Sequence, residues 1–304
     1  MINKVNDFWS WREWKISWSL ANIPEMNSHK NILLIHGFGA SKNHWRYNQD
    51  FLGEQSNCFA VDLLGFGESS QPRSLLDYES PKNNSTKYCF DLWGEQIVDF
   101  CKENIQSPVF LIGNSIGGIV ALRAAQILQD HCAGVILIDC AQRTMDDKRL
   151  KKNNFLMNLI RPIIKTAVRP RFISNTIFKR AANRKIIREI LKKAYPSGKN
   201  IDDQLIEILY KPSQRKNSAE AFRGFINLFD DYLATDLFNK VENNIHLIWG
   251  EKDPWESLHE AKEWKENYAN IKSLDIIKDT GHCPHDENPY ETNKLILKII
   301  QEIK

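Results

Sequence analysis

The sequence Gly-Asn-Ser-Ile-Gly at 113–117 constrains the fold most, because it places a serine at a sharp turn between a strand and a helix. The apolar run 109–112 predicts a buried strand, and the segment 119–125 predicts a helix. Glycines two positions before and after Ser115 permit a tight turn, since side chains there would collide with the neighbouring strand and helix. Ser115 would then project at the helix N-terminus, where the dipole favours negative charge. This pattern is typical of a nucleophilic serine.

Strands alternate with helices along most of the chain, which favours a largely parallel sheet covered by helices on both faces. The predicted strands are at 8–12, 15–21, 31–35, 58–61, 109–112, 134–139, 245–250 and 273–277. The alternation stops between 141 and 235, where the sequence predicts helices and no convincing strand. We therefore expect an α/β fold whose core comprises 1–140 and 236–304, with 141–235 inserted after the sixth strand as a helical cap.

A serine hydroxyl is a weak nucleophile at neutral pH and needs a general base that is oriented by an acid. His282 follows the predicted strand 273–277, and Asp253 follows the predicted strand 245–250. Because ligands and chemistry gather at the carboxyl edge of such sheets, we expect both side chains to lie near Ser115. The sequence therefore predicts Ser115 as nucleophile, His282 as base and Asp253 as the acid.

Other carboxylates compete for the role of the acid. Glu251 and Asp279 flank the same loops, but the proline after Asp253 fixes a turn that can point its carboxylate inward. Asp139, directly after the sixth strand, stays an alternative acid. Asp62 is interpreted as bracing the loop that holds Gly65 and Gly67 by hydrogen bonds.

The remaining histidines have structural interpretations. His36 precedes a tight glycine turn and is expected to brace that loop, and His285 is expected at the start of a helix. No catalytic context surrounds the others, which are His29, His44, His131, His246 and His259.

Acyl transfer also needs donors for the oxyanion of the tetrahedral intermediate. The backbone N–H of Ile116, directly after the nucleophile, is one predicted donor. The N–H of Phe38, in the turn 36–39 after the third strand, is the other, and its ring is expected to line the pocket. This chemistry requires no metal ion and no organic cofactor.

Five motifs, taken together and in this order, resemble the α/β-hydrolase superfamily over nearly all of the chain outside the insertion. They occur at 36–39, 62–69, 113–118, 250–254 and 281–287. The resemblance implies the α/β-hydrolase fold with its chain order of serine, acid and histidine. Haloalkane dehalogenases and epoxide hydrolases of this superfamily carry aspartate at the turn, so Ser115 implies an acyl-serine intermediate.

Within the superfamily, the chain is most similar to plant and cyanobacterial hydrolases that include pheophytinases and chlorophyll dephytylases. The shared features are the tryptophan-rich start at 8–12, Asn114 in the turn, and the run 281–285. This similarity implies hydrolysis of the phytol ester of a chlorophyll pigment.

The predicted insertion 141–235 is strongly basic, with 21 Lys and Arg against 9 Asp and Glu. The rest of the chain has 20 Lys and Arg against 29 Asp and Glu. One interpretation is a cap whose apolar helix faces cover the active site and whose basic faces are solvated. A second is peripheral contact with an anionic membrane surface, which basic amphipathic helices suit.

Composition limits the other classes of function. The six cysteines form no C-x-x-C pair, so we expect reduced thiols in a cytoplasmic protein, which on the second interpretation of the insertion is peripheral to a membrane surface. The start of the sequence lacks an apolar signal segment, and no run approaches the roughly 18 apolar residues of a spanning helix. The net charge of +3 is too small to imply nucleic-acid binding. We expect a monomer that acts on a small lipophilic ester.

The sequence thus predicts a serine hydrolase that cleaves a carboxylic ester with a large apolar group, such as a chlorophyll-type phytol ester or a lipid. A C–C bond hydrolase or a cofactor-free perhydrolase would use the same residues. A ligand-binding receptor on a hydrolase scaffold is an alternative of another class.

Overall fold

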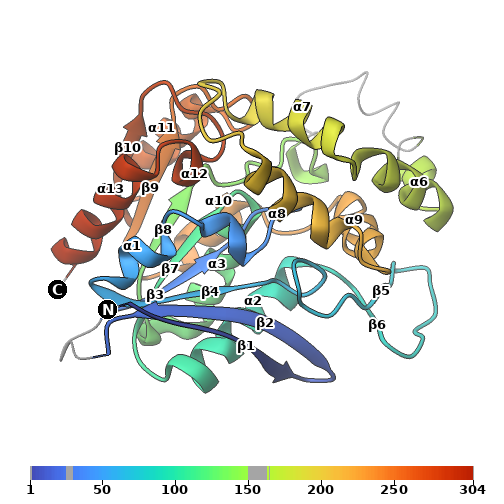
Figure 1. Cartoon of the computed structure of the whole chain (residues 1–304), viewed down its shortest axis with the longest axis horizontal. Coiled ribbons are helices and arrows are strands. Elements are labelled where there is room, and N and C mark those ends of the chain that lie inside the picture. The colour runs from blue at the N-terminus through green and yellow to red at the C-terminus, as the bar shows by residue number, and fades with distance from the viewer. Residues whose placement is uncertain (1, 25–29, 150–162, 164, 304) are drawn as a thin grey trace.

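The computed structural model describes residues 2–24, 30–149, 163 and 165–303, and its centre is an eight-stranded sheet (Figure 1). All eight predicted strands are present, so the predicted α/β fold is confirmed. In sheet order they are β1 (Asn3–Trp11), β2 (Trp14–Asn22), β4 (Ser56–Val61), β3 (Lys30–Ile35), β7 (Val109–Asn114), β8 (Cys132–Ile138), β9 (Ile245–Gly250) and β10 (Ile271–Ile277).

The sheet is parallel from β4 to β10, while β1 and β2 form an antiparallel hairpin whose second strand pairs with β4. Every residue of β7 and β9 is buried, as their apolar sequences require for strands covered on both faces. Two tryptophans of the hairpin anchor it to the helical segment at 90–105. The indole N–H of Trp9 donates to Glu103, and that of Trp11 donates to Asp99, each at 2.8 Å.

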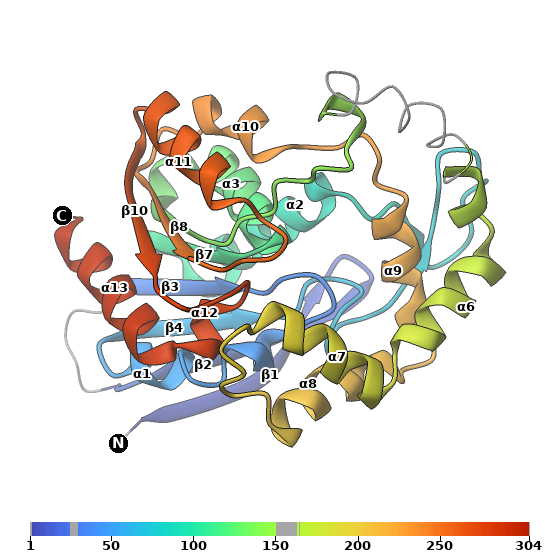
Figure 2. The same cartoon turned by 90° about the horizontal axis from the view of Figure 1, so that it is seen from above.

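Helices cover both faces of the sheet. One face carries α2 (Phe90–Phe100), α3 (Ile116–Leu128), α10 (Ala234–Leu237) and α11 (Leu258–Asn267). The other carries α1 (Gln49–Gly53) and α13 (Pro289–Glu302), which follows the short α12 (Pro284–Glu287). Figure 2 shows α3 and α11 on one side of the strands and α1 on the other. The helix α2 begins at Phe90 and is followed by a wider π-helical turn, Cys101–Ile105.

A group of helices lies between β8 and β9 in the chain. It comprises α6 (Arg171–Ala181), α7 (Arg184–Ala194), α8 (Asp203–Ser213) and α9 (Ser218–Ile226), which gather together on one side of the molecule (Figure 2). The described residues between 141 and 235 contain no strand. The apolar run at 155–164 of the sequence lies outside the described residues, apart from Ile163.

Arg46 attaches these helices to the rest of the fold. Its guanidinium pairs with Asp202, the N-cap of α8, and with the buried Asp286 of α12, both at 2.7 Å. Because one cation bridges a carboxylate on each side, the position of α8 is tied to the loop that follows β10.

The polar segment 71–86 contains one short strand pairing. Arg73–Ser74 (β5) pairs in parallel with Ser85–Thr86 (β6). The buried guanidinium of Arg223 donates to Ser74 and to Glu79, which fixes this segment against α9. Because Arg223 lies far along the chain from the segment that it holds, the local sequence does not signal this strand pairing.

No helix among the described residues has the length and apolar character needed to cross a membrane. All six cysteines are free, and five of them are buried.

Candidate active site

Ser115 occupies the sharp turn between β7 and α3 in a strained conformation, with φ 54° and ψ −122°. A Cβ at Gly113 would lie 2.1 Å from the carbonyl oxygen of Gly117, and one at Gly117 would lie 2.4 Å from that of Ile35. The glycines are therefore required by close backbone approach, as predicted from the sequence. A non-glycine residue held at positive φ is typical of functional turns whose surroundings determine the backbone.

His282 and Asp253 form a hydrogen-bonded pair. The Nδ1 of His282 lies 2.8 Å from Oδ2 of Asp253, whose side chain is fully buried. The other oxygen of Asp253 accepts the backbone N–H groups of Trp255 and Glu256. Burial alone would raise the pKa of Asp253, but the hydrogen bond and charge of His282 outweigh it and hold that pKa below its ordinary value. Asp253 is thus set to stay ionised and to orient the imidazole.

Two contacts hold the loop that carries His282. The N–H of His282 donates to the carbonyl of Ala194, at the end of α7, at 2.9 Å. The side-chain amide of Asn114, next to the nucleophile, donates to the carbonyl of His282 at 3.1 Å. The ring of Trp255 packs edge-on against the imidazole, with centroids 4.8 Å apart. The loop is therefore tied both to the Ser115 turn and to the helices between β8 and β9.

Ser115 and His282 line one cavity of about 380 Å³. The sheet side of this cavity also includes Phe38 and Ile116, whereas its other walls are largely apolar side chains of α7, α8 and α9. These wall residues are Ile190, Leu191, Ala194, Leu209 and Phe225. The structure therefore brings all five sequence-predicted site residues to one place, with Asp253 behind His282.

The geometry of Phe38 and Ile116 fits the predicted role of their backbone N–H groups. Among the hydrogen bonds of the described residues, neither N–H donates to a protein acceptor. Ile116 is the first residue of α3, so its N–H is one of the unpaired donors at a helix start. The Phe38 ring stacks on Phe225 of α9 with centroids 4.2 Å apart, which fixes the turn beneath the cavity.

Two of the competing acids, Glu251 and Asp279, bond other groups. Glu251 is exposed and accepts the backbone N–H of Asp279, while the Asp279 side chain pairs with Lys252 at 2.5 Å. Asp62 accepts the backbone N–H groups of Lys42 and Glu68, which confirms its predicted bracing of the loop. The other predicted brace, His36, accepts the N–H of Leu63 at 3.1 Å. His285 lies in the first turn of α12.

Sequence reasoning missed two groups near the pair, His44 and Glu256, and named a third, Asp139, only as an alternative acid. His44, which had no catalytic context in the sequence, lines the cavity, and its Nε2 lies 2.8 Å from the hydroxyl of Tyr195. Burial lowers the pKa of His44 to about 4, so the ring is neutral at pH 7. Glu256 also lines the cavity, and burial is the main reason that its pKa rises to about 7. Asp139 contacts the Asp253 carboxyl. Only Asp139 had a sequence signal, its place at a strand end.

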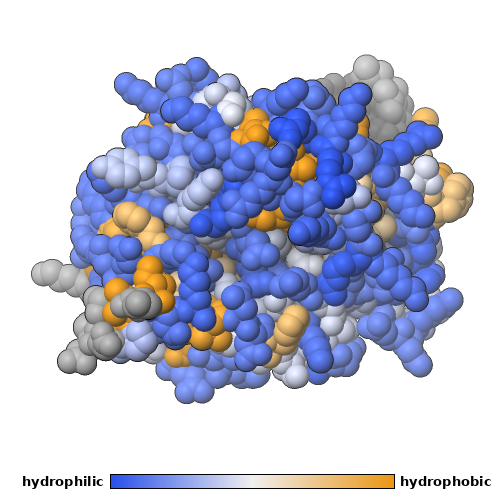
Figure 3. Space-filling view, viewed as in Figure 1, coloured by the Kyte–Doolittle hydropathy of each residue, from blue (hydrophilic) through white to orange (hydrophobic). Residues whose placement is uncertain are grey.

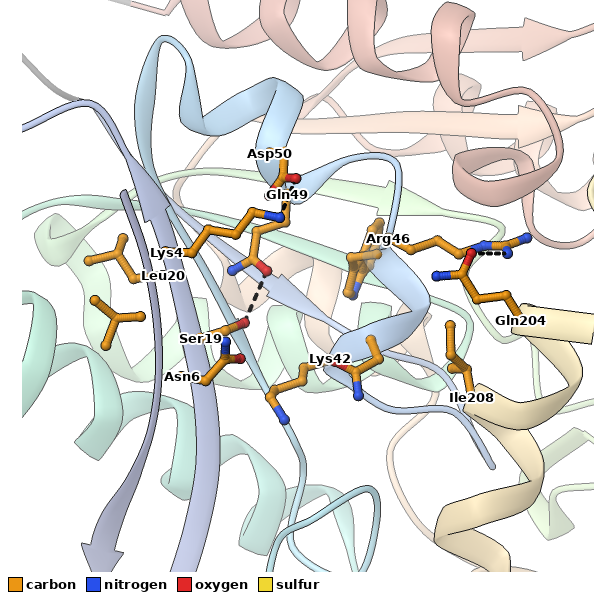
Figure 4. Close-up of a pocket in the computed structure, with 13 residues that line it drawn as sticks. Lys4, Asn6, Ser19, Leu20, Lys42, Arg46, Gln49, Asp50, Gln204 and Ile208 are labelled. Atoms are coloured by element: carbon orange, nitrogen blue, oxygen red, sulfur yellow. Dashed lines mark hydrogen bonds and ion pairs between the residues drawn. The ribbon is translucent and has the colours of Figure 1, made fainter. Parts of the chain in front are cut away.

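A second cavity, of about 320 Å³, lies between the β1–β2 hairpin, the turn Lys42–Trp45 and α8 (Figure 4). Its polar side chains bond one another. The Ser19 hydroxyl donates to Gln49 at 3.0 Å, and Lys4 pairs with Asp50. This cavity contains no pair of nucleophile and base. Among the described residues, no group of three or more His, Cys, Asp or Glu side chains is placed to hold a metal ion.

Comparison with known proteins agrees with this geometry. Residues 32–295 match the model of a family described as the alpha/beta hydrolase family. The chain belongs to the alpha/beta hydrolase family. The resemblance inferred from the motifs is thereby confirmed, and the family membership supports a hydrolase.

The relatives of this alpha/beta hydrolase include enzymes of several specificities. Chloroplastic pheophytinase from Arabidopsis thaliana is 26% identical over 299 residues, covering 90% of this chain and 61% of that protein. The human (lyso)-N-acylphosphatidylethanolamine lipase is 30% identical over 122 residues, covering 40% of this chain and 33% of that protein. The chain thus spans less than two thirds of the length of either relative.

Solved structures share the fold at low identity. The epoxide hydrolase CorEH has a TM-score of 0.77 and 17% identity, over 99% of this chain and 100% of that one. A thermophilic esterase from Thermogutta terrifontis has a TM-score of 0.71 and 18% identity, over 99% of both chains. Likeness at this level establishes the architecture only.

Proposed function

We propose that this protein is a serine hydrolase that cleaves a carboxylic ester with a large apolar group through an acyl-serine intermediate. The observation that carries the proposal is the placement of Ser115, in its strained turn, in one cavity with a histidine that is paired to a buried carboxylate. Nucleophile, base and orienting acid are the arrangement that acyl transfer requires.

These residues would carry out the two halves of an acyl-transfer cycle. Ser115 Oγ attacks the ester carbonyl carbon while His282 takes its proton, and the N–H groups of Ile116 and Phe38 stabilise the oxyanion. His282 next protonates the departing alcohol, and the acyl group stays on Ser115. A water molecule, deprotonated by His282, attacks the acyl carbon, and His282 returns the proton to the Ser115 oxygen as the acid leaves. Asp253 stabilises the imidazolium form in both halves of the cycle.

The apolar cavity walls support a lipophilic substrate, and we propose that α6 to α9 form the cap that holds it. The similarity to pheophytinase makes a phytol-type ester the first candidate, and the shorter match to a lipase makes a lipid ester the second. In this proposal α6 to α9 determine which ester is bound, while residues at the carboxyl edge of the sheet carry out the reaction.

Turnover of esters with increasing chain length tests the function and the substrate class together. We expect kcat/KM to rise from acetyl to long-chain p-nitrophenyl esters, by roughly tenfold for every two buried methylenes. Pheophytin and chlorophyll extend the series. The measurement is steady-state hydrolysis under multiple turnover.

Two outcomes would contradict the proposal. Absence of turnover on every ester, combined with a single-turnover adduct at Ser115, would favour a ligand-binding receptor. A rate that is flat with chain length would exclude recognition of a large apolar group, even if the enzyme is an esterase.

We also propose that α6 and α7 contact an anionic membrane surface. Both helices expose large apolar side chains, with Phe172 72% and Ile190 44% exposed, and Figure 3 shows apolar atoms among hydrophilic ones over α7. Lys185 and Lys193 of α7 are exposed and make no ion pair with another described residue. Since Ile190 also lines the cavity, a lipophilic substrate could pass directly from a lipid surface to Ser115.

Vesicle binding tests this surface. We expect salt-sensitive binding to vesicles of anionic phospholipid and little binding to phosphatidylcholine vesicles. The double change Lys185→Glu/Lys193→Glu is expected to weaken binding roughly tenfold or more, at about 1 kcal/mol per basic residue near the surface. The matched control, Lys262→Glu/Lys294→Glu on α11 and α13, alters net charge equally and should leave binding unchanged. Equal loss in both variants, or no binding to anionic vesicles, would exclude the proposed surface.

A further inference from the structure

The carboxyl of Asp139 lies behind the Asp253–His282 pair and is fully buried. Asp139 directly follows β8 and has a positive φ of 42°, in a region that aspartate tolerates better than most residues other than glycine. Its Oδ1 accepts the backbone N–H of Gly250, the last residue of β9, at 3.0 Å. The side chain therefore joins the end of one strand to the start of the loop that carries Asp253.

The second oxygen, Oδ2, has an unusual environment. Among the described residues, no N–H or O–H group donates to it, although it is buried. The carboxyl of Asp253 also lies within hydrogen-bonding reach of the Asp139 side chain. Two ionised carboxylates cannot bond one another, and their repulsion in a buried site would be severe, so a hydrogen bond between them needs a proton on one of the two.

The remaining contacts decide which carboxyl carries that proton. Asp253 accepts hydrogen bonds from Nδ1 of His282 and from two backbone N–H groups, and all three favour its ionised form. Asp139 accepts only the N–H of Gly250. Burial, followed by the charge of Asp253, raises the pKa of Asp139 well above its ordinary value. Within the described part of the chain, the other titratable groups that interact with Asp139 are Glu256, Cys140 and Cys283, none of which can supply a positive charge.

We propose that Asp139 keeps its proton at neutral pH and donates it in a hydrogen bond to Asp253, which makes Asp139 a positioning residue for the Asp253–His282 pair. The bond adds one more fixed contact to Asp253 and draws part of its negative charge away from the imidazole. The positioning role rests on the proposed hydrolase function, whereas the location of the proton does not.

Carbon-13 NMR locates the proton without any substrate. Protein labelled at the side-chain carboxyl carbon of aspartate contains no signal from Glu256, and the resonance lost in Asp139→Asn identifies Asp139. We expect that resonance at the position of a neutral carboxylic acid, unchanged between pH 5 and pH 8. A carboxylate position at pH 7, or titration within this range, overturns the proposal.

Unfolding equilibria give a second readout that is independent of activity. The unfolded chain releases the Asp139 proton above pH about 3.9, whereas the native chain keeps it, so wild-type stability should fall as pH rises. Asp139→Asn has no such proton to release. The ratio of the two unfolding constants should therefore change by roughly tenfold per pH unit between pH 5 and pH 7. A ratio that is independent of pH would mean that Asp139 is ionised in the native protein.

Kinetics test the positioning role. The amide of Asp139→Asn can accept from Gly250 and donate to Asp253, so kcat should stay within about threefold of wild type. Asp139→Ala can do neither, and we expect kcat to fall roughly tenfold or more, with little change in KM and a displaced acidic limb of the pH profile. Equal losses in both variants would overturn the positioning role. If Asp139→Ala does not fold, the asparagine variant decides alone, because a loss above tenfold contradicts a neutral donor.

Discussion

Ser115→Ala is expected to lower kcat for a p-nitrophenyl acyl ester by about 10⁴- to 10⁶-fold, because it removes the hydroxyl that forms the acyl intermediate. The backbone donors at Phe38 and Ile116 stay in place, so a small residual rate over water should persist. Alanine and serine both carry a Cβ and meet a similar steric cost at the positive φ of this position. The substitution should therefore leave the fold intact. Steady-state kinetics measure the effect on kcat. Thermal unfolding checks that the variant is folded.

Covalent labelling makes the same test independent of the substrate chosen. A fluorophosphonate should modify wild-type protein at Ser115, as located by peptide mapping, and should not modify the alanine variant. Ser10→Ala, on an exposed position of β1, is the matched control and should behave as wild type in both assays. Retained turnover in Ser115→Ala, or labelling at another serine, would refute the assignment of the nucleophile.

The Ser115 turn could be predicted from sequence because its requirements are local. Gly113 and Gly117 are needed by backbone atoms within the same strand–turn–helix unit and by the adjacent β3, so the pattern carries its own geometry. The loops of Asp253 and His282 could be placed for a related reason. Both follow strands of a parallel sheet, whose carboxyl ends meet at one edge.

The surroundings of the pair could not be predicted in this way. Trp255 and Glu256 reach the site only because the loop after β9 turns back toward His282, and His44 does so through the fold of a loop far away in the chain. The apolar walls come from separate helices, with Leu209 on α8 and Phe225 on α9. Helical periodicity predicts that such helices exist, but their relative packing depends on tertiary contacts such as that of Arg46 with Asp202.

Asp253→Asn is expected to lower kcat by about 10⁴-fold with a small change in KM, because asparagine favours the wrong tautomer of the imidazole. The Nδ1 of His282 should then no longer carry the proton that the carboxylate accepts at 2.8 Å, and Nε2 would not be free to accept from Ser115. The backbone N–H groups of Trp255 and Glu256 can still bond the amide oxygen. The loop should therefore keep its conformation, and the loss of kcat should come from the altered imidazole and not from a displaced loop.

Glu251→Gln is the matched control, because it neutralises a carboxylate in the same loop and so shows whether the loss of activity is specific to Asp253. Glu251 lies two residues earlier and is exposed, so its neutralisation should change kcat by less than about twofold. A loss below tenfold in Asp253→Asn would mean that another carboxylate orients His282, and Asp139, which already touches Asp253, would be the first to examine. The double variant Asp139→Asn/Asp253→Asn decides that case. If Asp139 substitutes for the missing carboxylate, the second change should remove the remaining activity, whereas a neutral Asp139 predicts no further loss.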